Sequence, residues 1–182
     1  LPINSAVGGY RGQGSPSFDD SDFFSLQQTR DGSTAQAQTE LGTQYRDGDG
    51  VRQDHAQAMR FYRLASEQGD TKAQVNLGTM YRDGDGVPQD YKAAMRWYRR
   101  AAGQGLAEAQ TLVGEMYFHG LGVSPDNAKA IQWYRLAVVQ GNARAQTNLG
   151  SMWAHGYGVP ADVGKALSLH RLAAEQGHAD AQ

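Results

Sequence analysis

The heptapeptide YRDGDGV, found at residues 45–51 and again at 81–87, places two aspartates between glycines, where they could bind a metal ion or a phosphate. A calcium loop of the common type also needs a distal bidentate glutamate, which this pattern does not supply. A phosphate-binding loop needs Gly-Lys-Ser or Gly-Lys-Thr, which does not follow here. We therefore predict a turn between two helices, shaped by the glycines and decorated by the acids.

Glu115 and His119 lie one helical turn apart, and His155 follows 36 residues later, so these three side chains could be zinc ligands. Zinc ligands must converge to about 2 Å from one ion. Equivalent positions on stacked helices are about 8–10 Å apart. We therefore predict no metal site and interpret both histidines as recognition or solvent positions.

Other chemistry has little support in the composition. The chain has no cysteine, and neither Gly-x-Ser-x-Gly nor Ser-x-x-Lys occurs, so we predict no catalytic residue, no cofactor and no enzymatic activity. The net charge of -2 gives no general attraction for nucleic acid. No apolar run approaches the roughly 18 residues of a membrane span. We expect a monomer whose partners are proteins.

The heptapeptide is one part of a longer period. Ala-Gln pairs recur every 36 residues, at 37/38, 73/74, 109/110, 145/146 and 181/182. Apolar residues within each period are spaced by three or four, which is typical of helices, and two such stretches flank the glycine turn. The sequence predicts an all-α fold, built as a superhelix of about four helix-turn-helix repeats of 36 residues.

Several recurring residues are expected to set the ends and the packing of these helices. Asp54 and its equivalents precede the second helix, where a carboxylate can cap backbone N–H groups. Gly69 and its equivalents, including Gly177, are expected to end it. Gly42 and its equivalents lie inside the first helix, and we expect close helix approach there, with small residues such as Ala58 opposite.

The pattern A-x-A-Q-x-x-L-G-x-x-Y-x-x-G-x-G-V-x-x-D-x-x-x-A-x-x-W-Y-R-x-A-x-x-Q-G at residues 71–105 resembles the Sel-one-like repeat, a relative of the tetratricopeptide repeat. The resemblance covers about residues 35–182 and implies a right-handed α-solenoid. It also implies an adaptor in bacterial signalling, envelope or secretion systems, or in endoplasmic-reticulum quality control. Some cysteine-rich relatives are linked to β-lactam binding or hydrolysis, which is the alternative function for this cysteine-free chain.

The predicted organisation has three parts. Residues 1–20 are rich in glycine, proline and serine and are expected to be irregular. Residues 21–34 are expected to form a degenerate helix that caps the array. Residues 35–182 hold four repeats, at about 35–70, 71–106, 107–142 and 143–178, and the start of a fifth.

Partner contacts are expected on the first helices, because in related solenoids these helices line the concave face. The predicted groove is rich in Arg and Asp at its N-terminal end and in His and aromatic residues at its C-terminal end. The predicted partner-binding residues are Thr43, Arg46, Asp47, Lys72, Thr79, Arg82, Asp83, Glu115, Phe118, His119, Ser151 and His155.

Phe118 has two interpretations, which are a partner anchor and packing against the following turn at Tyr157. The recurring Phe61, Trp97 and Trp133 are assigned to the core. Arg63 and its equivalents are expected to pair with a neighbouring acid or turn carbonyl.

We therefore expect a non-enzymatic module that binds a protein in its concave face. One version is an immunity protein that neutralises a secreted effector toxin, for example a type VI lipase. The other version is an envelope or signalling adaptor. The chain starts at Leu1 and its N-terminus is polar, which favours a periplasmic or other extracytoplasmic location in a bacterium over a cytoplasmic one.

Overall fold

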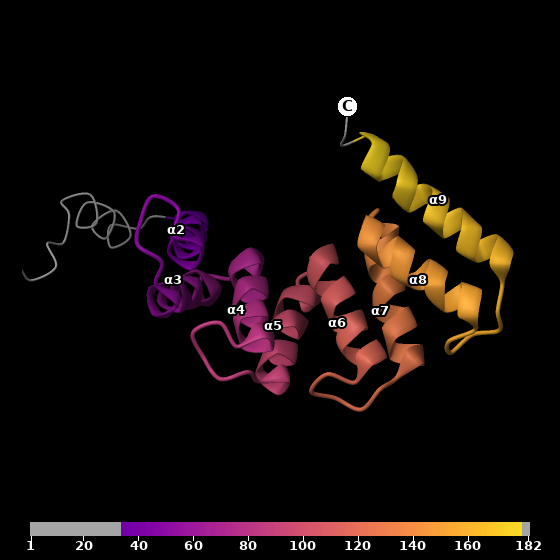
Figure 1. The fold of residues 1–182 in the computed structure, drawn as a ribbon, viewed down its shortest axis with the longest axis horizontal. Coiled ribbons are helices and arrows are strands. Elements are labelled where there is room, and N and C mark those ends of the chain that lie inside the picture. The colour runs from indigo at the N-terminus through magenta and orange to yellow at the C-terminus, as the bar shows by residue number, and fades with distance from the viewer. Residues whose placement is uncertain (1–33, 180–182) are drawn as a thin grey trace, which may run out of the picture. The chain divides into compact units, whose positions relative to one another are not determined.

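The structure is a computed structural model that describes residues 34–179. The predicted irregular segment, all of the predicted capping helix except Thr34, and residues 180–182 lie outside the described residues. Within residues 34–179 there are eight helices and no strand (Figure 1), and all of them belong to the compact unit that begins at Thr34. They are α2 (Ala35–Asp47), α3 (His55–Glu67), α4 (Thr71–Asp83), α5 (Tyr91–Gly103), α6 (Ala107–His119), α7 (Asn127–Val139), α8 (Ala143–His155) and α9 (Val163–Ala179).

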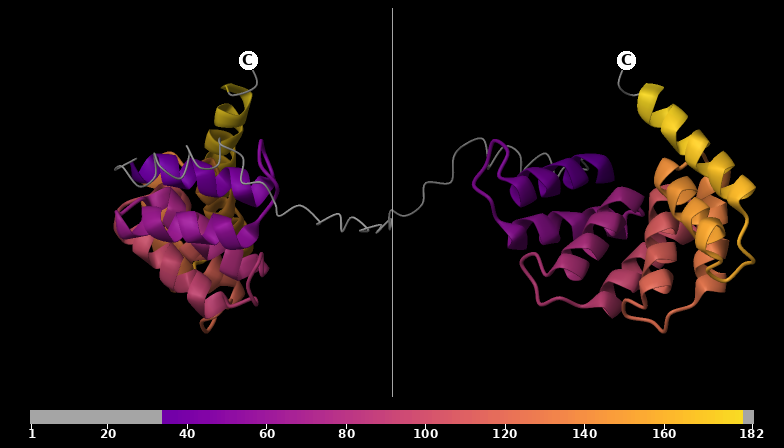
Figure 2. Two further views of the ribbon diagram at one scale, coloured as in Figure 1. Left: turned by 90° about the vertical axis from the view of Figure 1, so that its left-hand side faces the viewer. Right: turned by 45° about the vertical axis from the view of Figure 1, so that its right-hand side comes forward.

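The helices form four successive pairs, α2/α3, α4/α5, α6/α7 and α8/α9, which follow one another along a curved array (Figure 2). Each pair contains one first helix and one second helix of the 36-residue period. The buried residues form two apolar clusters that run along the array, between and within the pairs. This arrangement confirms the predicted all-α solenoid, in which each repeat packs against its neighbours.

The second helices begin at the predicted aspartate caps. The Asp54 carboxylate accepts hydrogen bonds from the backbone N–H groups of Ala56 and Gln57, at 2.9 and 3.0 Å. Asp90, Asp126 and Asp162 each accept one such bond at 2.9 Å, from the third residue after them. These bonds satisfy N–H groups that have no partner inside the helix, so the prediction is confirmed.

The glycines between the two helices shape the turn. Gly48 and Gly50 both have φ of +73°, in the left-handed region that favours glycine, and Gly48 ends α2. Their equivalents in the other three repeats have φ between +70° and +79°. The turn prediction is confirmed, because each of these recurring backbone reversals lies in the left-handed region that favours glycine.

The glycine inside each first helix allows close approach, but the residue opposite it is not the predicted alanine. A Cβ atom added at Gly78 would lie 2.5 Å from Cε1 of Tyr98, and one at Gly42 would lie 2.7 Å from the Tyr62 ring. The flat face of a buried tyrosine therefore lies directly on the glycine backbone. Ala58 contributes only its backbone oxygen, 3.2 Å from the same added atom at Gly42.

One predicted helix end is wrong. Gly69, Gly105 and Gly141 have φ of +92°, +92° and +80° and follow the second helices of the first three repeats. Gly177 instead lies inside α9, which continues to Ala179. In the first three repeats the left-handed glycine reverses the chain into the next first helix, whereas no described helix follows α9.

The recurring glutamines form a ladder of hydrogen bonds that was not predicted from the sequence. The side-chain amide of Gln68 donates to the side-chain carbonyl of Gln38 at 2.8 Å, and Gln104 donates to Gln74 at 2.9 Å. The same bond, between residues 30 apart, occurs in repeats three and four, at 2.9 and 3.1 Å. Each bond joins the start of the first helix to the end of the second, and its acceptor is buried. The recurring Ala-Gln pair and the glutamine that precedes Gly69 and its equivalents are therefore two halves of one contact.

Two further core and scaffold predictions need correction. Phe61 is buried, but Trp97 and Trp133 are only half-buried and pack against the edge of the core. Arg63 donates to the Tyr81 hydroxyl at 3.1 Å, instead of to an acid or a carbonyl. Its equivalent Arg171 does lie beside an acid, as predicted, at 4.0 Å from Glu175 in an exposed pair.

Candidate protein-binding face

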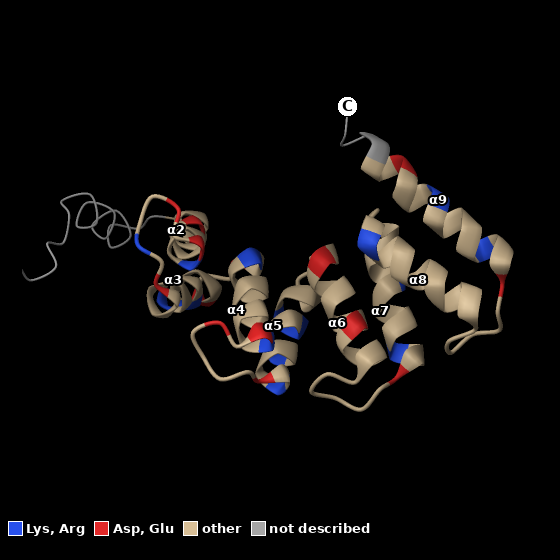
Figure 3. Cartoon of the chain, in the orientation of Figure 1, with Lys and Arg blue, Asp and Glu red and all other residues tan. Residues whose placement is uncertain are grey.

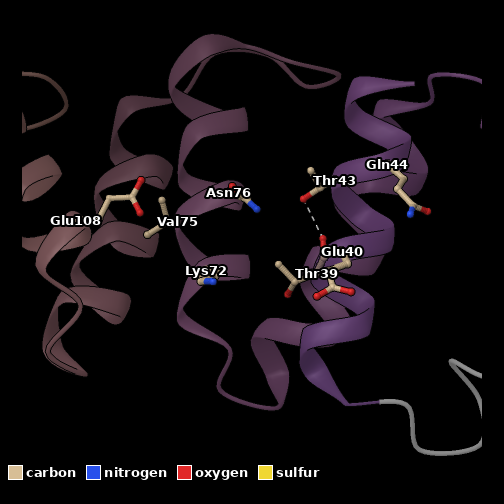
Figure 4. Close-up of a pocket in the computed structure, with 8 residues that line it drawn as sticks. All are labelled: Thr39, Glu40, Thr43, Gln44, Lys72, Val75, Asn76 and Glu108. Atoms are coloured by element: carbon tan, nitrogen blue, oxygen red, sulfur yellow. Dashed lines mark hydrogen bonds between the residues drawn. The ribbon is translucent and has the colours of Figure 1, made fainter. Parts of the chain in front are cut away.

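The first helices α2, α4, α6 and α8 together form a surface that we name the first-helix face, and it contains two hollows. The N-terminal hollow has a volume of about 470 Å³ and lies mainly between α2 and α4 (Figure 4). Its lining residues are Thr39, Glu40, Thr43, Gln44, Lys72, Val75, Asn76 and Glu108.

The C-terminal hollow has a volume of about 410 Å³ and lies mainly between α6 and α8. Its lining residues are Glu115, Phe118, His119, Tyr134, Arg144, Asn148, Ser151, Met152 and Tyr157. Tyr134 and Met152 are buried, whereas Arg144 and His119 are exposed. The hollow thus combines an apolar floor with a polar rim, as binding sites commonly do.

Aromatic rings form one wall of the C-terminal hollow. The Phe118 ring lies 5.6 Å from the Tyr157 ring and 4.9 Å from the His119 ring, measured between centroids. The His155 ring stacks on the Tyr157 ring, with a distance of 5.4 Å between centroids. Phe118 therefore packs against the following turn, and it is half-buried while still lining the hollow. The wall presents both apolar surface and ring nitrogens to a partner.

The Glu115 carboxylate links two neighbouring repeats at the C-terminal hollow. Glu115 on α6 accepts a hydrogen bond from Arg144 Nη2 at 2.5 Å and another from Asn148 Nδ2 at 2.9 Å. Burial, with a further contribution from Glu115, raises the pKa of the neighbouring Tyr134 phenol. Both oxygens of Glu115 are thus occupied. Within residues 34–177, no group of three or more His, Asp or Glu side chains could hold a metal ion.

The Arg and Asp residues at the ends of α2 and α4 form paired charges. Arg82 Nε and Nη2 donate to the two oxygens of Asp83, at 2.7 and 2.8 Å, and Arg46 binds Asp47 in the same way. The hydrogen bond from arginine lowers the pKa of each aspartate and raises the pKa of each arginine. A partner would therefore meet two compact, locally neutral pairs with fixed geometry.

Two of the predicted contact residues have a structural role. The Thr43 and Tyr62 hydroxyls share a hydrogen bond of 3.1 Å, and Thr79 and Tyr98 do the same. These bonds satisfy the buried tyrosines that lie on the helix glycines. Burial also raises the pKa of both phenols.

The structure distributes the predicted partner-binding residues as follows. Thr43 and Lys72 lie in the N-terminal hollow, whereas Glu115, Phe118, His119 and Ser151 lie in the C-terminal hollow. Asn76 and Asn148, which the prediction omitted, also line the hollows. Both stand four residues after a cation on a first helix, and that spacing is the sequence signal that identifies them.

Charges of both signs occur along the described array (Figure 3), so no long stretch of one sign covers it. Recognition on this face would depend on individual charged pairs and hollows. None of the described helices is long and apolar enough to cross a membrane.

The 36-residue hairpins, their glycine turns and their aspartate caps agree with a known family. The family described as Sel1 repeat matches residues 35–70, 71–106, 107–142 and 143–178. The chain belongs to the Sel1 repeat family. No curated protein matches it significantly.

Crystal structures of Sel1 repeat proteins are similar to the chain over most of its length. The protective antigen c5321 of uropathogenic Escherichia coli, which displays an SLR fold, is 42% identical with a TM-score of 0.81, over 85% of this chain and 33% of that one. A Sel1 repeat protein from Oxalobacter formigenes is 34% identical with a TM-score of 0.79, over 85% and 61%. The chain therefore spans less than two thirds of either relative's length.

A third similar structure has a named role. The immunity protein Pa5087 from Pseudomonas aeruginosa is 25% identical, with a TM-score of 0.59, over 85% of this chain and 57% of that one.

Proposed function

We propose that this Sel1 repeat array is a protein-binding module without enzymatic activity, and that it holds its partner on the first-helix face. The observation that carries the proposal is the pair of hollows on successive first helices, each combining polar rim groups with apolar lining. Sel1 repeat solenoids are a protein-interaction fold, which supports the same conclusion. Aromatic and arginine side chains, such as Phe118 and Arg82, are among the types that are enriched at protein interfaces.

The partner in this proposal is a toxic effector protein, and the chain acts as its immunity protein in an extracytoplasmic compartment of a bacterium. The support is the similarity to Pa5087. An immunity protein must bind its effector tightly and needs no catalysis, and the preformed hollows of the first-helix face suit such binding. An adaptor would bind its partner on the same face, but that partner would be harmless to the cell.

The binding surface is tested by purifying the protein that the chain captures and measuring its affinity by calorimetry. Arg82→Ala and His119→Ala should each weaken binding by more than about 1 kcal/mol, because both side chains are accessible on the first-helix face. Arg96→Ala on α5, an exposed arginine on a second helix, is the matched control and should change nothing. Unchanged binding by both first-helix variants would refute the proposed surface.

The immunity role is tested by expressing the captured protein in a bacterium with and without the chain. We expect growth to stop without the chain and to recover with it, and we expect the double variant Arg82→Ala/His119→Ala to lose this protection. A captured protein that has no effect on growth would contradict immunity and favour the adaptor role.

A further inference from the structure

A similar pair of side chains, a cation and an asparagine, occurs in both hollows. Lys72 and Asn76 stand on α4, and Arg144 and Asn148 stand at the equivalent positions of α8, two repeats later. Each pair consists of a cation followed four residues later by an asparagine, so both members lie on one side of the helix. The other two repeats have no such pair, because these positions are Gln36 and Glu40 in α2, and Glu108 and Leu112 in α6.

The pair on α8 shows what this arrangement binds. Arg144 Nη2 donates to one oxygen of the Glu115 carboxylate at 2.5 Å, and Asn148 Nδ2 donates to the other oxygen at 2.9 Å. The carboxylate comes from the preceding first helix, α6. A cation and an amide, spaced by one helical turn, thus form a two-point receptor for a carboxylate.

The pair on α4 lacks this internal carboxylate. The position equivalent to Glu115 is Thr43 on α2, whose short side chain bonds to Tyr62 instead. Within residues 34–177, no hydrogen bond or ion pair involves Lys72 Nζ or Asn76 Nδ2. Both side chains line the N-terminal hollow.

The Asn76 side chain is oriented so that its amide nitrogen can donate a hydrogen bond to a ligand. Arg46 Nη1 donates to Asn76 Oδ1 at 3.5 Å, which directs the carbonyl end toward the arginine. Figure 4 shows Lys72 and Asn76 on α4 with Thr43 facing them from α2. The amide nitrogen points into the space between the two helices, where Glu115 would have its counterpart.

We propose that Lys72 and Asn76 bind a carboxylate supplied by the partner protein, in the place that Glu115 takes in the C-terminal hollow. The proposal rests on the proposed function only in assigning that carboxylate to a protein. The carboxylate belongs either to an Asp or Glu side chain or to a C-terminus, since both present the same two oxygens to the receptor.

Two acids of the chain line the same hollow and limit what it accepts. Glu40 accepts a hydrogen bond from Gln36 at 2.9 Å and forms no ion pair with Lys72 within 4.0 Å. Glu108 lies on α6, on the other side of Lys72 and Asn76 from α2 (Figure 4). Both are exposed, so water screens them. They disfavour a run of acids and leave room for one carboxylate beside neutral or basic neighbours.

Nuclear magnetic resonance with three short peptides tests the site. The probes are acetyl-Ala-Glu-Ala-amide, acetyl-Ala-Gln-Ala-amide and acetyl-Ala-Gln-Ala with a free C-terminal carboxylate. We expect the Glu peptide, the free-carboxylate peptide or both to shift the Asn76 side-chain amide signal, with saturation in the millimolar range. The uncharged Gln peptide should not shift it. The pattern identifies which source of carboxylate fits.

Two exchanges between the hollows provide the matched variants. Thr43→Glu would supply the internal carboxylate, so it should abolish the peptide-induced shift at Asn76. Glu115→Thr would remove it from the other hollow, so a new shift should appear at the side-chain amide of Asn148. Glu40→Gln should strengthen peptide binding at Asn76 by removing a nearby negative charge. Melting temperatures measured on each variant verify that it is folded.

The proposal is overturned if neither carboxylate peptide shifts Asn76, if the Gln peptide shifts it equally, or if Thr43→Glu leaves the shift intact. These outcomes are separate from the fate of the proposed function. If partner binding still depends on Arg82 and His119 when the peptides fail, only the carboxylate site is wrong. If the peptides bind but the captured protein ignores Arg82 and His119, the site stands and the proposed surface is wrong.

Discussion

Replacing the glycine inside a first helix tests how the two helices of a repeat are held together. Alanine in a helix interior is more favourable than glycine by about 1 kcal/mol, so Gly78→Ala would stabilise an unobstructed helix. The new Cβ atom, however, would lie 2.5 Å from Cε1 and 2.6 Å from Cδ1 of Tyr98. Tyr98 is fully buried and its hydroxyl is bonded to Thr79 at 3.1 Å, so the ring has no room to move away.

Forcing an extra methyl group into a packed core costs about 1–3 kcal/mol, and the short distances at Gly78 place this site in the upper part of that range. After the gain in helix propensity, we expect a net loss of about 1–2 kcal/mol in the free energy of unfolding. Gly150→Ala should be nearly neutral, because the nearest atom there is Nε2 at the end of the His170 side chain, at 3.0 Å.

Gly103→Ala is the matched control. Gly103 is also helical, at the end of α5, and nothing lies within 4 Å of a Cβ atom added there. This change should stabilise the protein by up to about 1 kcal/mol. Urea unfolding followed by circular dichroism measures all three variants. The reasoning is refuted if Gly78→Ala is as stable as Gly103→Ala, since the glycine would then not be required by the tyrosine.

Three further predictions concern the glutamine ladder, the charged pairs and catalysis. Gln104→Ala should lower the free energy of unfolding by about 1–3 kcal/mol, because it leaves the fully buried Gln74 carbonyl without its donor, whereas the exposed Gln132→Ala should have little effect in the same urea experiment. Arg82 lowers the pKa of Asp83 below its ordinary 3.8. The stability that this pair gives to the fold is therefore fully present above pH 3.8 and is lost as the pH falls through the lowered value. The melting temperature should therefore fall as the pH drops below about 4, and Arg82→Ala should reduce part of that fall; an identical profile would contradict the pairing. The pure protein should not hydrolyse a β-lactam or a phosphoester, and turnover abolished by a substitution in the C-terminal hollow would contradict the non-enzymatic assignment.

The 36-residue period predicted the fold because each structural requirement recurs four times in the sequence. A turn that needs left-handed backbone shows as a repeated glycine, as at Gly48, and a helix start shows as a repeated aspartate, as at Asp54. The residues that face each other across a helix–helix interface are harder to predict. The spacing gave no means of choosing between Ala58 and Tyr62 as the residue opposite Gly42, because both lie on the same helix face one turn apart.

Side-chain pairing explains what the sequence could not predict about the candidate site. Glu115 was predicted as a partner-binding residue, and the sequence did not show that Arg144 and Asn148 from the next repeat occupy its carboxylate. Those bonds depend on the distance between α6 and α8, which no spacing within one helix reveals. The glutamine ladder was missed for the same reason, since its two signatures lie 30 residues apart and meet only when the hairpin closes.

Site-specific cross-linking shows which face of the array the partner contacts. The chain has no cysteine, so a single introduced cysteine can carry a photoreactive benzophenone at one chosen place. Suitable positions are Gln44 and Ser151, which line the two hollows, and Arg96, which is exposed on α5. We predict that the purified partner cross-links to the labels at 44 and 151 and not to the label at 96. Cross-linking at 96 alone would show that the partner binds the second helices, which contradicts the account.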